Sequence, residues 1–252
     1  MISIICVYND KTLVHDYLLG SLENQTVPYE LILQDNTLNE YHSASSALNS
    51  GAEKAKGKYL MFVHQDIDLS SNTWLENAER MLDSLSNLGI AGVAGVSENL
   101  KGISTNLKQG DPPAAIGQFK VDKPLDVQTL DECLVIIPRS VFLENKFDED
   151  VCDGWHLYAV DYSLGIKSKG LRVLVLPVYV YHRSPGVSLS AKYYFNLERI
   201  MKKHKARYPV IYTTVGHWDT SKSLYYYLYK YFKVRIIRIG MRLKRYAKES
   251  LS

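Results

Sequence analysis

The first half of the chain alternates between short apolar runs and longer segments in which apolar residues recur every three or four positions. A short apolar run predicts a strand, and the three-to-four spacing predicts a helix. Strands are expected at 2–7, 30–35, 59–63 and 90–96, and helices at 10–23, 43–55 and 72–86. Strands that alternate with helices predict an α/β fold, with a mostly parallel central sheet and helices on both faces.

The second half continues this pattern less regularly. Residues 97–124 are rich in Gly, Pro and Lys, which predicts a long mobile loop. Beyond it, strands are expected at 133–138 and 172–177, and helices at 159–170 and 190–206.

Polar side chains follow three of the predicted strands, at the point where each strand ends. They are Tyr8 and Asn9, then Asp35 and Asn36, and then the stretch from His64 to Asp68. In an open α/β sheet, ligands bind outside the carboxyl ends of the strands. We therefore expect these side chains to meet in one ligand site.

Two aspartates in the third group suggest a bound cation. Asp66 and Asp68 follow an apolar run that predicts a buried strand, where carboxylates are costly unless something compensates their charge. Carboxylate oxygens suit Mg²⁺ or Mn²⁺ held together with substrate phosphates. The alternative is that Asp68, Ser70 and Ser71 cap the following helix.

The cysteines and the apolar segments favour a cytoplasmic protein. Cys6, Cys133 and Cys152 are widely spaced and lack CxxC spacing, which suits a reducing compartment and gives no zinc signal. The start of the chain is expected to be a strand rather than a signal peptide. The apolar stretch at 171–182 is too short to span a bilayer.

Positive charge is concentrated at the end of the chain. Residues 222–252 carry a net charge of +8 and the remainder −5, although the total is only +3. Apolar residues in this segment share one face of a predicted helix: Phe232, Ile236, Ile239, Leu243 and Ala247. Such a helix can lie on an anionic membrane surface, so peripheral association with the inner face of the cell membrane is expected. The alternatives are packing against the domain or a homodimer contact. No nucleic-acid-binding module accompanies the charge, so nucleic acid is not expected as a partner.

Several segments, taken in order, resemble the family-2 glycosyltransferases of the GT-A fold. They are SIICVYND, LILQDN, ALNSGAEKAKGKYLMFVHQD, FDED at 147–150, VDYSLGIKSKGLRVLVLP and VYHRS. The resemblance covers about residues 1–185. It implies a GT-A-like catalytic domain over 1–215, made of a nucleotide-binding half (1–96), an acceptor half (97–185) and a helical extension (186–215), followed by the basic segment 216–252.

The resemblance implies roles for the residues at matching positions. Those expected to bind or support the nucleotide are Cys6, Tyr8, Asn9, Asp35, Asn49, Gly51, His64 and Gln65. Asp66 would ligate the metal on the diphosphate, and His182 would complete the metal shell. The first carboxylate of the family's metal motif falls on His64, so the motif is either His64-Gln65-Asp66 or Asp66-Ile67-Asp68.

The implied reaction is displacement at the anomeric carbon with inversion, which needs a base for the acceptor hydroxyl. The family's E-D-x-D segment corresponds here to Tyr158-Ala159-Val160-Asp161, so the usual acidic pair is missing. Asp161 remains, and Asp153 and His156 lie just upstream; these three are the candidate catalytic groups. Asp161 could instead be an acid in the first turn of a helix, where the dipole favours it.

Three further residues are expected to contact sugars. Asp131 and Glu132 lie just before a predicted strand, although they could also be a solvated strand edge. Trp155 lies in a predicted loop and could stack on a sugar ring.

The resemblance therefore implies transfer of a sugar from a nucleotide-diphospho-sugar, with a UDP-sugar expected. The acceptor would be a glycan or a lipid-linked molecule in cell-surface polysaccharide or lipopolysaccharide synthesis. The alternative is a non-catalytic GT-A-like protein that binds nucleotide sugars or acts as a scaffold. A nucleotidyltransferase or a Rossmann dehydrogenase is disfavoured because no glycine-rich loop follows the first strand.

Overall fold

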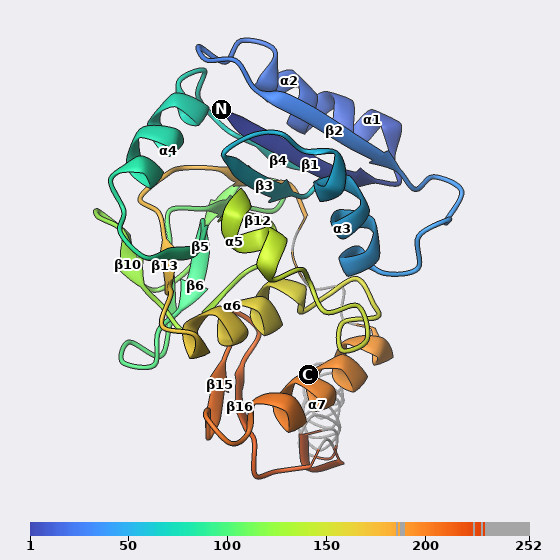
Figure 1. The fold of residues 1–252 in the computed structure, drawn as a ribbon, viewed down its shortest axis with the longest axis vertical. Helices are drawn as coiled ribbons and strands as arrows, with labels where there is room; N and C mark the ends of the chain where they lie inside the picture. The colour runs from blue at the N-terminus through green and yellow to red at the C-terminus, as the bar shows by residue number, and fades with distance from the viewer. Residues whose placement is uncertain (185, 187–189, 224, 228, 230–252) are drawn as a thin grey trace, which may run out of the picture.

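The structure, a computed structural model, describes residues 1–184, 186, 190–223, 225–227 and 229. Its centre is a seven-stranded mixed sheet in the order β10-β13-β5-β12-β3-β1-β2 (Figure 1). The strands are β1 (Ile2–Tyr8), β2 (Glu30–Asp35), β3 (Tyr59–Val63), β5 (Leu88–Gly92), β10 (Leu125–Asp126), β12 (Leu134–Pro138) and β13 (Arg172–Val175). All of them point in one direction except β12 and β10, which run antiparallel to their neighbours. The predicted α/β fold with a mostly parallel sheet is confirmed.

Helices cover both faces of this sheet (Figure 1). One face is covered by α1 (Lys11–Val14), the π-helical turn η1 (His15–Leu19), α2 (Gly20–Leu22) and α4 (Trp74–Asp83). The other is covered by α3 (Ala44–Lys54), α5 (Arg139–Glu144) and α6 (Tyr158–Ser168), and α7 (Ala191–His204) packs outside α6.

Each face of the sheet has its own apolar core because strand side chains alternate in direction. Ile4 and Met61 lie in the core under α4, whereas Ile5 and Phe62 lie in the core under α3 and α6. Every residue of β3 is buried. Burial on both faces explains why this strand is apolar throughout.

Local side-chain hydrogen bonds set where two of the predicted helices begin. The carboxylate of Asp10 accepts a hydrogen bond from the Leu13 backbone N–H at 2.9 Å, and the Ser43 hydroxyl accepts one from the Ser46 N–H at 3.2 Å. Both are N-caps that satisfy backbone donors of the first turn. The prediction of helices after β1 and β2 is thus confirmed, although a π-helical turn interrupts the first.

The segment 97–124, predicted as a long loop, contains short strands instead. β7 (Ile103–Thr105) pairs with β6 (Ala94–Val96), which also pairs with β11 (Thr129–Leu130). β8 (Lys108–Gln109) pairs with both β9 (Ala114–Ala115) and β14 (Tyr181–His182). The strand expected at 90–96 is divided into two strands. β5 belongs to the main sheet, and β6 belongs to a three-stranded sheet with β7 and β11. Strands of two or three residues leave no readable period in a sequence, and their partners lie far along the chain.

The described part of the chain continues past α7 into a hairpin of β15 (Val210–Tyr212) and β16 (His217–Asp219). The domain boundary expected between 215 and 216 lies between the two strands of this hairpin, in which 217–219 pair with 210–212. The basic helix predicted over 232–247 lies outside the described residues. Within the described ranges, no helix combines the length and the apolar character needed to cross a bilayer.

Candidate functional site

The carboxyl ends of three parallel strands lie side by side at one edge of the main sheet. β1 ends at Tyr8, β2 at Asp35, and His64 follows the last residue of β3. As the sequence predicted, these ends bring polar side chains to a common edge.

The reversed strand β12 adds residues that the predicted order of strands could not place. Leu134, the first residue of β12, pairs with Val63, the last residue of β3. The His64 backbone N–H donates a hydrogen bond to the Cys133 carbonyl at 2.9 Å. Because β12 starts where β3 ends, Asp131 and Glu132 lie at the same edge of the sheet.

A cavity of about 710 Å³ opens at this edge. This volume is typical of small-molecule sites, which span roughly 300–1,000 Å³. Of the residues predicted for the site, those that line the cavity are Tyr8, Asn9, His64, Gln65, Asp66, Asp131, Glu132, Trp155, His156 and His182.

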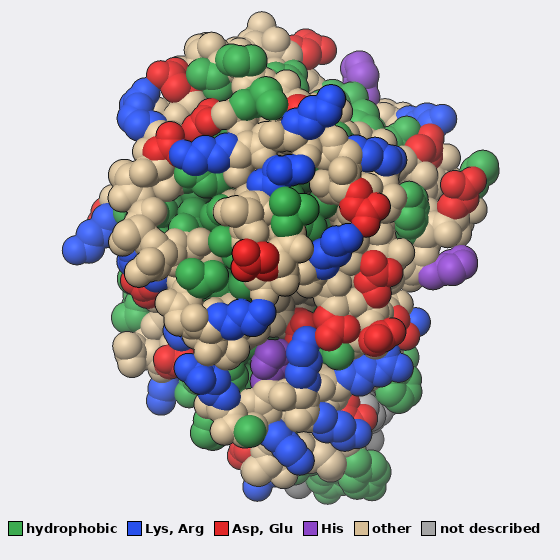
Figure 2. Space-filling view, viewed as in Figure 1, with side chains coloured by type: hydrophobic (Ala, Val, Ile, Leu, Met, Phe, Trp, Pro, Cys, Tyr) green, Lys and Arg blue, Asp and Glu red, His purple; other side chains and the backbone are tan. Residues whose placement is uncertain are grey.

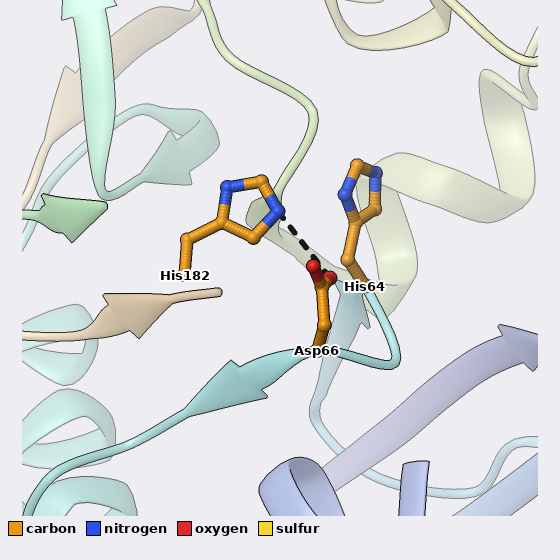
Figure 3. Close-up of side chains that lie close together, drawn as sticks. All are labelled: His64, Asp66 and His182. Atoms are coloured by element: carbon orange, nitrogen blue, oxygen red, sulfur yellow. Dashed lines mark ion pairs between the residues drawn. The ribbon is translucent and has the colours of Figure 1, made fainter. Parts of the chain in front are cut away.

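Three of these side chains converge at the end of β3 (Figure 3). His64 and Asp66 flank the turn between β3 and β4 (Ile67–Asp68), and His182 comes from β14, in which it pairs with Ile67 of β4. One ligand atom from each residue lies within 4.8 Å of the ligand atoms of the other two. This spacing allows a single cation to contact all three side chains.

The hydrogen bonding around His182 provides a test of whether a cation fits. Its Nε2 atom is buried and lies 3.3 Å from Asp66 Oδ1, within ion-pair distance, yet it makes no hydrogen bond of acceptable geometry. The other carboxylate oxygen of Asp66 accepts a hydrogen bond from the Ser184 N–H at 2.9 Å. A buried polar nitrogen without a hydrogen bond is costly, and a metal ion would satisfy it. Imidazole nitrogens and a carboxylate oxygen therefore fit a divalent ion here.

The electrostatic environment favours the protonation states that bind metal. Burial, followed by the neighbouring His182, lowers the pKa of His64 to about 4, so this imidazole is neutral at pH 7. Burial raises the pKa of Asp66, but His182 and His64 lower it more, and the net pKa lies below its ordinary value. A neutral imidazole and an ionised carboxylate are the forms that coordinate a cation.

Asp68, predicted as a further metal ligand, lies outside this group of three. Its carboxylate accepts a hydrogen bond from the Ser70 N–H, in a turn where Ser70 has a positive φ of 61°. Asp68 pairs with Tyr181, one residue before His182, so the side chains of Asp68 and His182 lie on opposite faces of this strand pair. The structure thus corrects this expectation: of the two alignments of the metal motif, His64-Gln65-Asp66 is the one whose end residues converge.

Gln65 joins the ends of two strands. Its side-chain oxygen accepts hydrogen bonds from the backbone N–H groups of Asn9 and Asp10, both at 3.0 Å, and its amide donates to Asn9 Oδ1 at 2.7 Å. These contacts hold the loop after β1 against the turn after β3. Asn9 and Gln65 therefore link the ends of β1 and β3 through hydrogen bonds.

Asp35 does not line the cavity itself, but it carries a negative charge next to Tyr8, which does. Its carboxylate accepts hydrogen bonds from the Thr37 hydroxyl (2.7 Å), the Thr37 N–H (2.8 Å) and the Tyr8 hydroxyl (2.9 Å). These bonds, those from Thr37 first, lower the pKa of Asp35 to about 2. An ionised acceptor is therefore available at the end of β2, next to a tyrosine that lines the cavity.

Three residues predicted to bind or support the nucleotide lie away from the cavity. Cys6 is completely buried in the apolar core, which raises the pKa of its thiol far above the usual range. Asn49 exchanges hydrogen bonds with the backbone of Phe147, at 2.9 and 3.1 Å. Gly51 lets α3 approach β1, because a Cβ atom there would lie 2.6 Å from Ile5 Cγ2. None of the three residues lines the cavity: Cys6 lies in the core, and Asn49 and Gly51, which were expected to support the nucleotide pocket, support the fold around it.

The structure also corrects the expectation that Asp161 is the catalytic base. Asp161 is buried between α6 and α7, where it accepts hydrogen bonds from His204 Nε2 at 2.8 Å and Lys203 Nζ at 2.7 Å. Its side chain does not line the cavity. The position of Asp161 on α6 directs its side chain toward α7, where both carboxylate oxygens accept hydrogen bonds.

Asp153 has a similar role at the surface. It forms ion pairs with Lys192 at 3.2 Å and Arg199 at 3.0 Å, both on α7, and it does not line the cavity. Figure 2 shows acidic and basic side chains next to one another over the lower part of this face, where α7 lies. Asp153 and Asp161 thus attach α7 to the domain.

Glu132 and His156 form a pair within the cavity. His156 Nδ1 lies 2.8 Å from Glu132 Oε1, and the Leu157 N–H donates to Glu132 Oε2 at 2.6 Å. Burial raises the pKa of Glu132, although the contact with His156 opposes that shift. Trp155, with 42% of its surface exposed, lies on the same wall. The cavity thus contains a carboxylate–imidazole pair in addition to the group of His64, Asp66 and His182.

The sequence-based prediction omitted many of the residues that line the cavity, and two of them, Arg183 and Thr214, are polar groups with a clear bearing on the site. Arg183 directly follows His182, so the adjacent HRS sequence was an available signal. Thr214 lies in the turn of the β15–β16 hairpin and donates a hydrogen bond to Asp131 Oδ2 at 2.7 Å. Nothing in the sequence around Thr214 indicates this contact, because it depends on how the hairpin docks.

Comparison with known proteins bears on the fold and on the family. No curated protein matches the chain. Among solved structures, it is similar to GalNAc-T7 with UDP, GalNAc and Mn²⁺ (15% identity, TM-score 0.58, covering 80% of this chain and 47% of that one). It is also similar to S. aureus TarS 1-349 in complex with UDP-GlcNAc (16% identity, TM-score 0.56, covering 80% of this chain and 66% of that one). A third similar structure is the mannosyltransferase PcManGT from Pyrobaculum calidifontis with GDP-Man and Mn²⁺ (15% identity, TM-score 0.57, covering 80% of this chain and 63% of that one).

These likenesses establish a GT-A fold, and the chain spans between 47% and 66% of the length of the three proteins. A family described as "Glycosyltransferase like family" matches residues 3–204. That range contains the main sheet except for its first residue, Ile2, together with the residues that converge at the end of β3 and the Glu132–His156 pair. The chain therefore belongs to this glycosyltransferase family, as the resemblance of its strand-end motifs implied.

Proposed function

We propose that this protein transfers a sugar from a nucleotide-diphospho-sugar to a hydroxyl of a glycan or lipid-linked acceptor, with inversion. The observation that carries the proposal is the convergence of His64, Asp66 and His182 on the cavity at the strand ends. Similar structures bound to UDP, UDP-GlcNAc or GDP-Man support a nucleotide-sugar donor. We favour a UDP-sugar because Tyr8 and Asp35 offer a ring and an ionised acceptor for a uracil base.

A Mn²⁺ or Mg²⁺ ion held by these three residues would act as a Lewis acid that neutralises the departing diphosphate. Arg183 lines the same cavity and adds a permanent positive charge beside the diphosphate. The exposed ring of Trp155 offers an apolar face to a sugar ring. Asn9 and Gln65 keep the two strand ends at a constant spacing, which orients the donor.

The composition of the metal-binding group predicts a preference among metals. Two imidazoles and one carboxylate suit Mn²⁺ better than Mg²⁺, because imidazole ligands favour transition metals and Mg²⁺ prefers oxygen. After treatment with EDTA, we expect Mn²⁺ to restore donor turnover about 10-fold more effectively than Mg²⁺ at equal concentration. Release of nucleoside diphosphate from a panel of UDP- and GDP-sugars, with and without acceptors, measures this.

The same assay tests the proposed function against the non-catalytic alternative. Two departures from the family pattern favour a binding or scaffold protein: Tyr158 and Ala159 replace the usual acidic pair, and His64 replaces the first carboxylate of the metal motif. Calorimetry that detected nucleotide-sugar binding, combined with no turnover across a broad acceptor panel with either metal, would contradict the enzyme and support the alternative.

We further propose that the acceptor belongs to cell-surface polysaccharide or lipopolysaccharide synthesis and that the basic tail holds the protein at the inner face of the membrane. The net charge of +8 over residues 222–252 supports this location. Each basic residue near an anionic leaflet contributes about 1 kcal/mol. We expect the full chain to sediment with vesicles containing phosphatidylglycerol but not with neutral vesicles. We expect 0.5 M salt to release the bound protein, because this is a roughly three-fold increase over physiological ionic strength and screens the attraction. Equal sedimentation with both vesicle types would refute the proposal, and a concentration-dependent dimer without vesicle binding would support the homodimer contact instead.

A further inference from the structure

The Glu132–His156 pair is the part of the cavity that the proposed metal-binding role leaves unused. Asp131, the neighbouring carboxylate, already accepts hydrogen bonds from the Thr214 hydroxyl at 2.7 Å and the Cys133 N–H at 3.1 Å. Asp161 is directed away from the cavity toward α7. Among the described residues, Glu132 and His156 thus form a carboxylate–imidazole pair in the cavity outside the group of His64, Asp66 and His182.

The backbone around the pair holds both side chains in position. Glu132 accepts hydrogen bonds through both carboxylate oxygens. Oε2 accepts from the Leu157 N–H at 2.6 Å, and Oε1 accepts from His156 Nδ1 at 2.8 Å. Leu157 adopts a φ of +74°, which is unusual for a residue with a branched side chain. Strained conformations of this kind persist where the surrounding structure demands them, and they cluster at functional sites. Here the strained residue directs its N–H at the carboxylate.

The imidazole of His156 is also held by a ring contact. The ring of Tyr193 from α7 packs edge-on against it, with centroids 6.0 Å apart. A carboxylate that accepts from Nδ1 selects the tautomer in which Nδ1 carries the proton and Nε2 carries the basic lone pair. A largely buried carboxylate in this position, with 15% of its side chain exposed, also stabilises the imidazolium that forms when Nε2 accepts a proton.

We propose that His156, oriented by Glu132, removes the proton from the acceptor hydroxyl during sugar transfer. In this step, the acceptor oxygen forms a bond to the anomeric carbon while the bond from that carbon to the diphosphate oxygen breaks. The electron pair of the broken bond leaves with the nucleoside diphosphate, and the hydroxyl proton moves to Nε2 of His156. The assignment rests on the proposed transferase function: His156 is the catalytic residue and Glu132 is a positioning residue.

A purely structural role for the pair makes a different prediction. Leu157 is the N-cap residue of α6, so Glu132 could serve only to hold the start of this helix. In that case, substitutions would lower stability, and the kcat of the folded protein would be unchanged. Measurements that separate acceptor activation from folding and from donor binding therefore decide between the two roles.

The test compares His156→Ala, Glu132→Gln and His15→Ala in the full chain with Mn²⁺ present. His15 is an exposed histidine on η1 and serves as the matched control. For His156→Ala, we expect kcat to fall about 100-fold or more, while calorimetry gives an unchanged affinity for UDP with Mn²⁺. Added imidazole is expected to restore part of this activity. Glu132→Gln is expected to lower kcat about 10-fold at an unchanged donor KM, because glutamine keeps the shape but not the charge.

Two results would overturn the assignment. One is a kcat for His156→Ala within about three-fold of that of His15→Ala, since a lost general base costs far more. The other is a loss of UDP affinity in parallel with kcat, which would indicate a collapsed site. A wild-type protein that binds UDP with Mn²⁺ but turns over no donor would instead remove the proposed transferase function, so the two failures are distinguishable.

Discussion

Asp66→Asn is expected to lower the kcat of sugar transfer by about 100-fold or more, because it removes the single negative charge from the proposed metal-binding group. Asparagine has nearly the same shape, so the Ser184 N–H can still donate to the side-chain oxygen and the turn is preserved. His64 and His182 would then face a cation without a carboxylate. The affinity for Mn²⁺, measured by calorimetry or by electron paramagnetic resonance of free Mn²⁺, should fall with the activity.

Asp68→Asn is the matched control for this prediction. It makes the same chemical change two residues along the chain, but Asp68 bonds to the Ser70 N–H and lies outside the metal-binding group. We expect its Mn²⁺ affinity and kcat to remain within about two-fold of wild type, as is usual for surface substitutions. The opposite pattern, with Asp68→Asn losing metal and Asp66→Asn retaining it, would favour the Asp66-Ile67-Asp68 alignment and contradict the site described above.

Asp161→Ala is expected to lower the free energy of unfolding by about 3 kcal/mol. Asp161 and His204 are both nearly buried, and removing the carboxylate leaves His204 and Lys203 without their shared anionic partner. A buried group that loses its partner retains its desolvation cost without compensation. Urea unfolding at pH 7 measures this change, and the kcat per folded molecule should stay close to that of wild type.

Asp153→Ala is the control for the stability effect. Asp153 also forms ion pairs with α7, but its side chain is 38% exposed. The side chains of its partners Lys192 and Arg199 are 52% and 48% exposed. Solvent screens such pairs, so the expected loss is below about 1 kcal/mol. Should Asp161→Ala leave stability unchanged yet abolish kcat, Asp161 would be the catalytic base after all.

The local pattern of apolar residues was sufficient to predict much of the fold. The strands expected at 30–35 and 59–63 are β2 and β3 with the same bounds. β3 is buried on both faces of the sheet, which is why five apolar residues follow one another in its sequence. The polar residues at the ends of β1, β2 and β3 could be grouped in advance because parallel strands end at a common edge.

Strand direction was not predictable in the same way. An apolar run such as 134–138 reads equally well as a parallel or an antiparallel strand, because side chains alternate in both. The insertion of β12 between β3 and β5, reversed, is what brings Glu132 to the cavity. A parallel β12 would have placed this residue at the opposite edge of the sheet.

Individual aspartates show the same limit at the level of side chains. Asp161 and Asp66 are each an acid next to a buried element, and sequence reasoning gave both a role in chemistry. Docking of α7 placed Lys203 and His204 against Asp161, whereas pairing of β14 with β4 placed His182 beside Asp66. The partner, rather than the residue type, separates a structural acid from a candidate metal ligand.

The sequence by itself therefore determined most of the longer strands and helices, the family and the edge of the sheet where the site lies. These depend on periodicity and on motifs that act over a few residues. Only the tertiary structure decided which polar groups share the cavity, namely His182 with His64 and Asp66, and His156 with Glu132. The physical reason is that these pairings depend on strand direction and helix docking, which are selected by burial and hydrogen bonding between segments far apart in the chain.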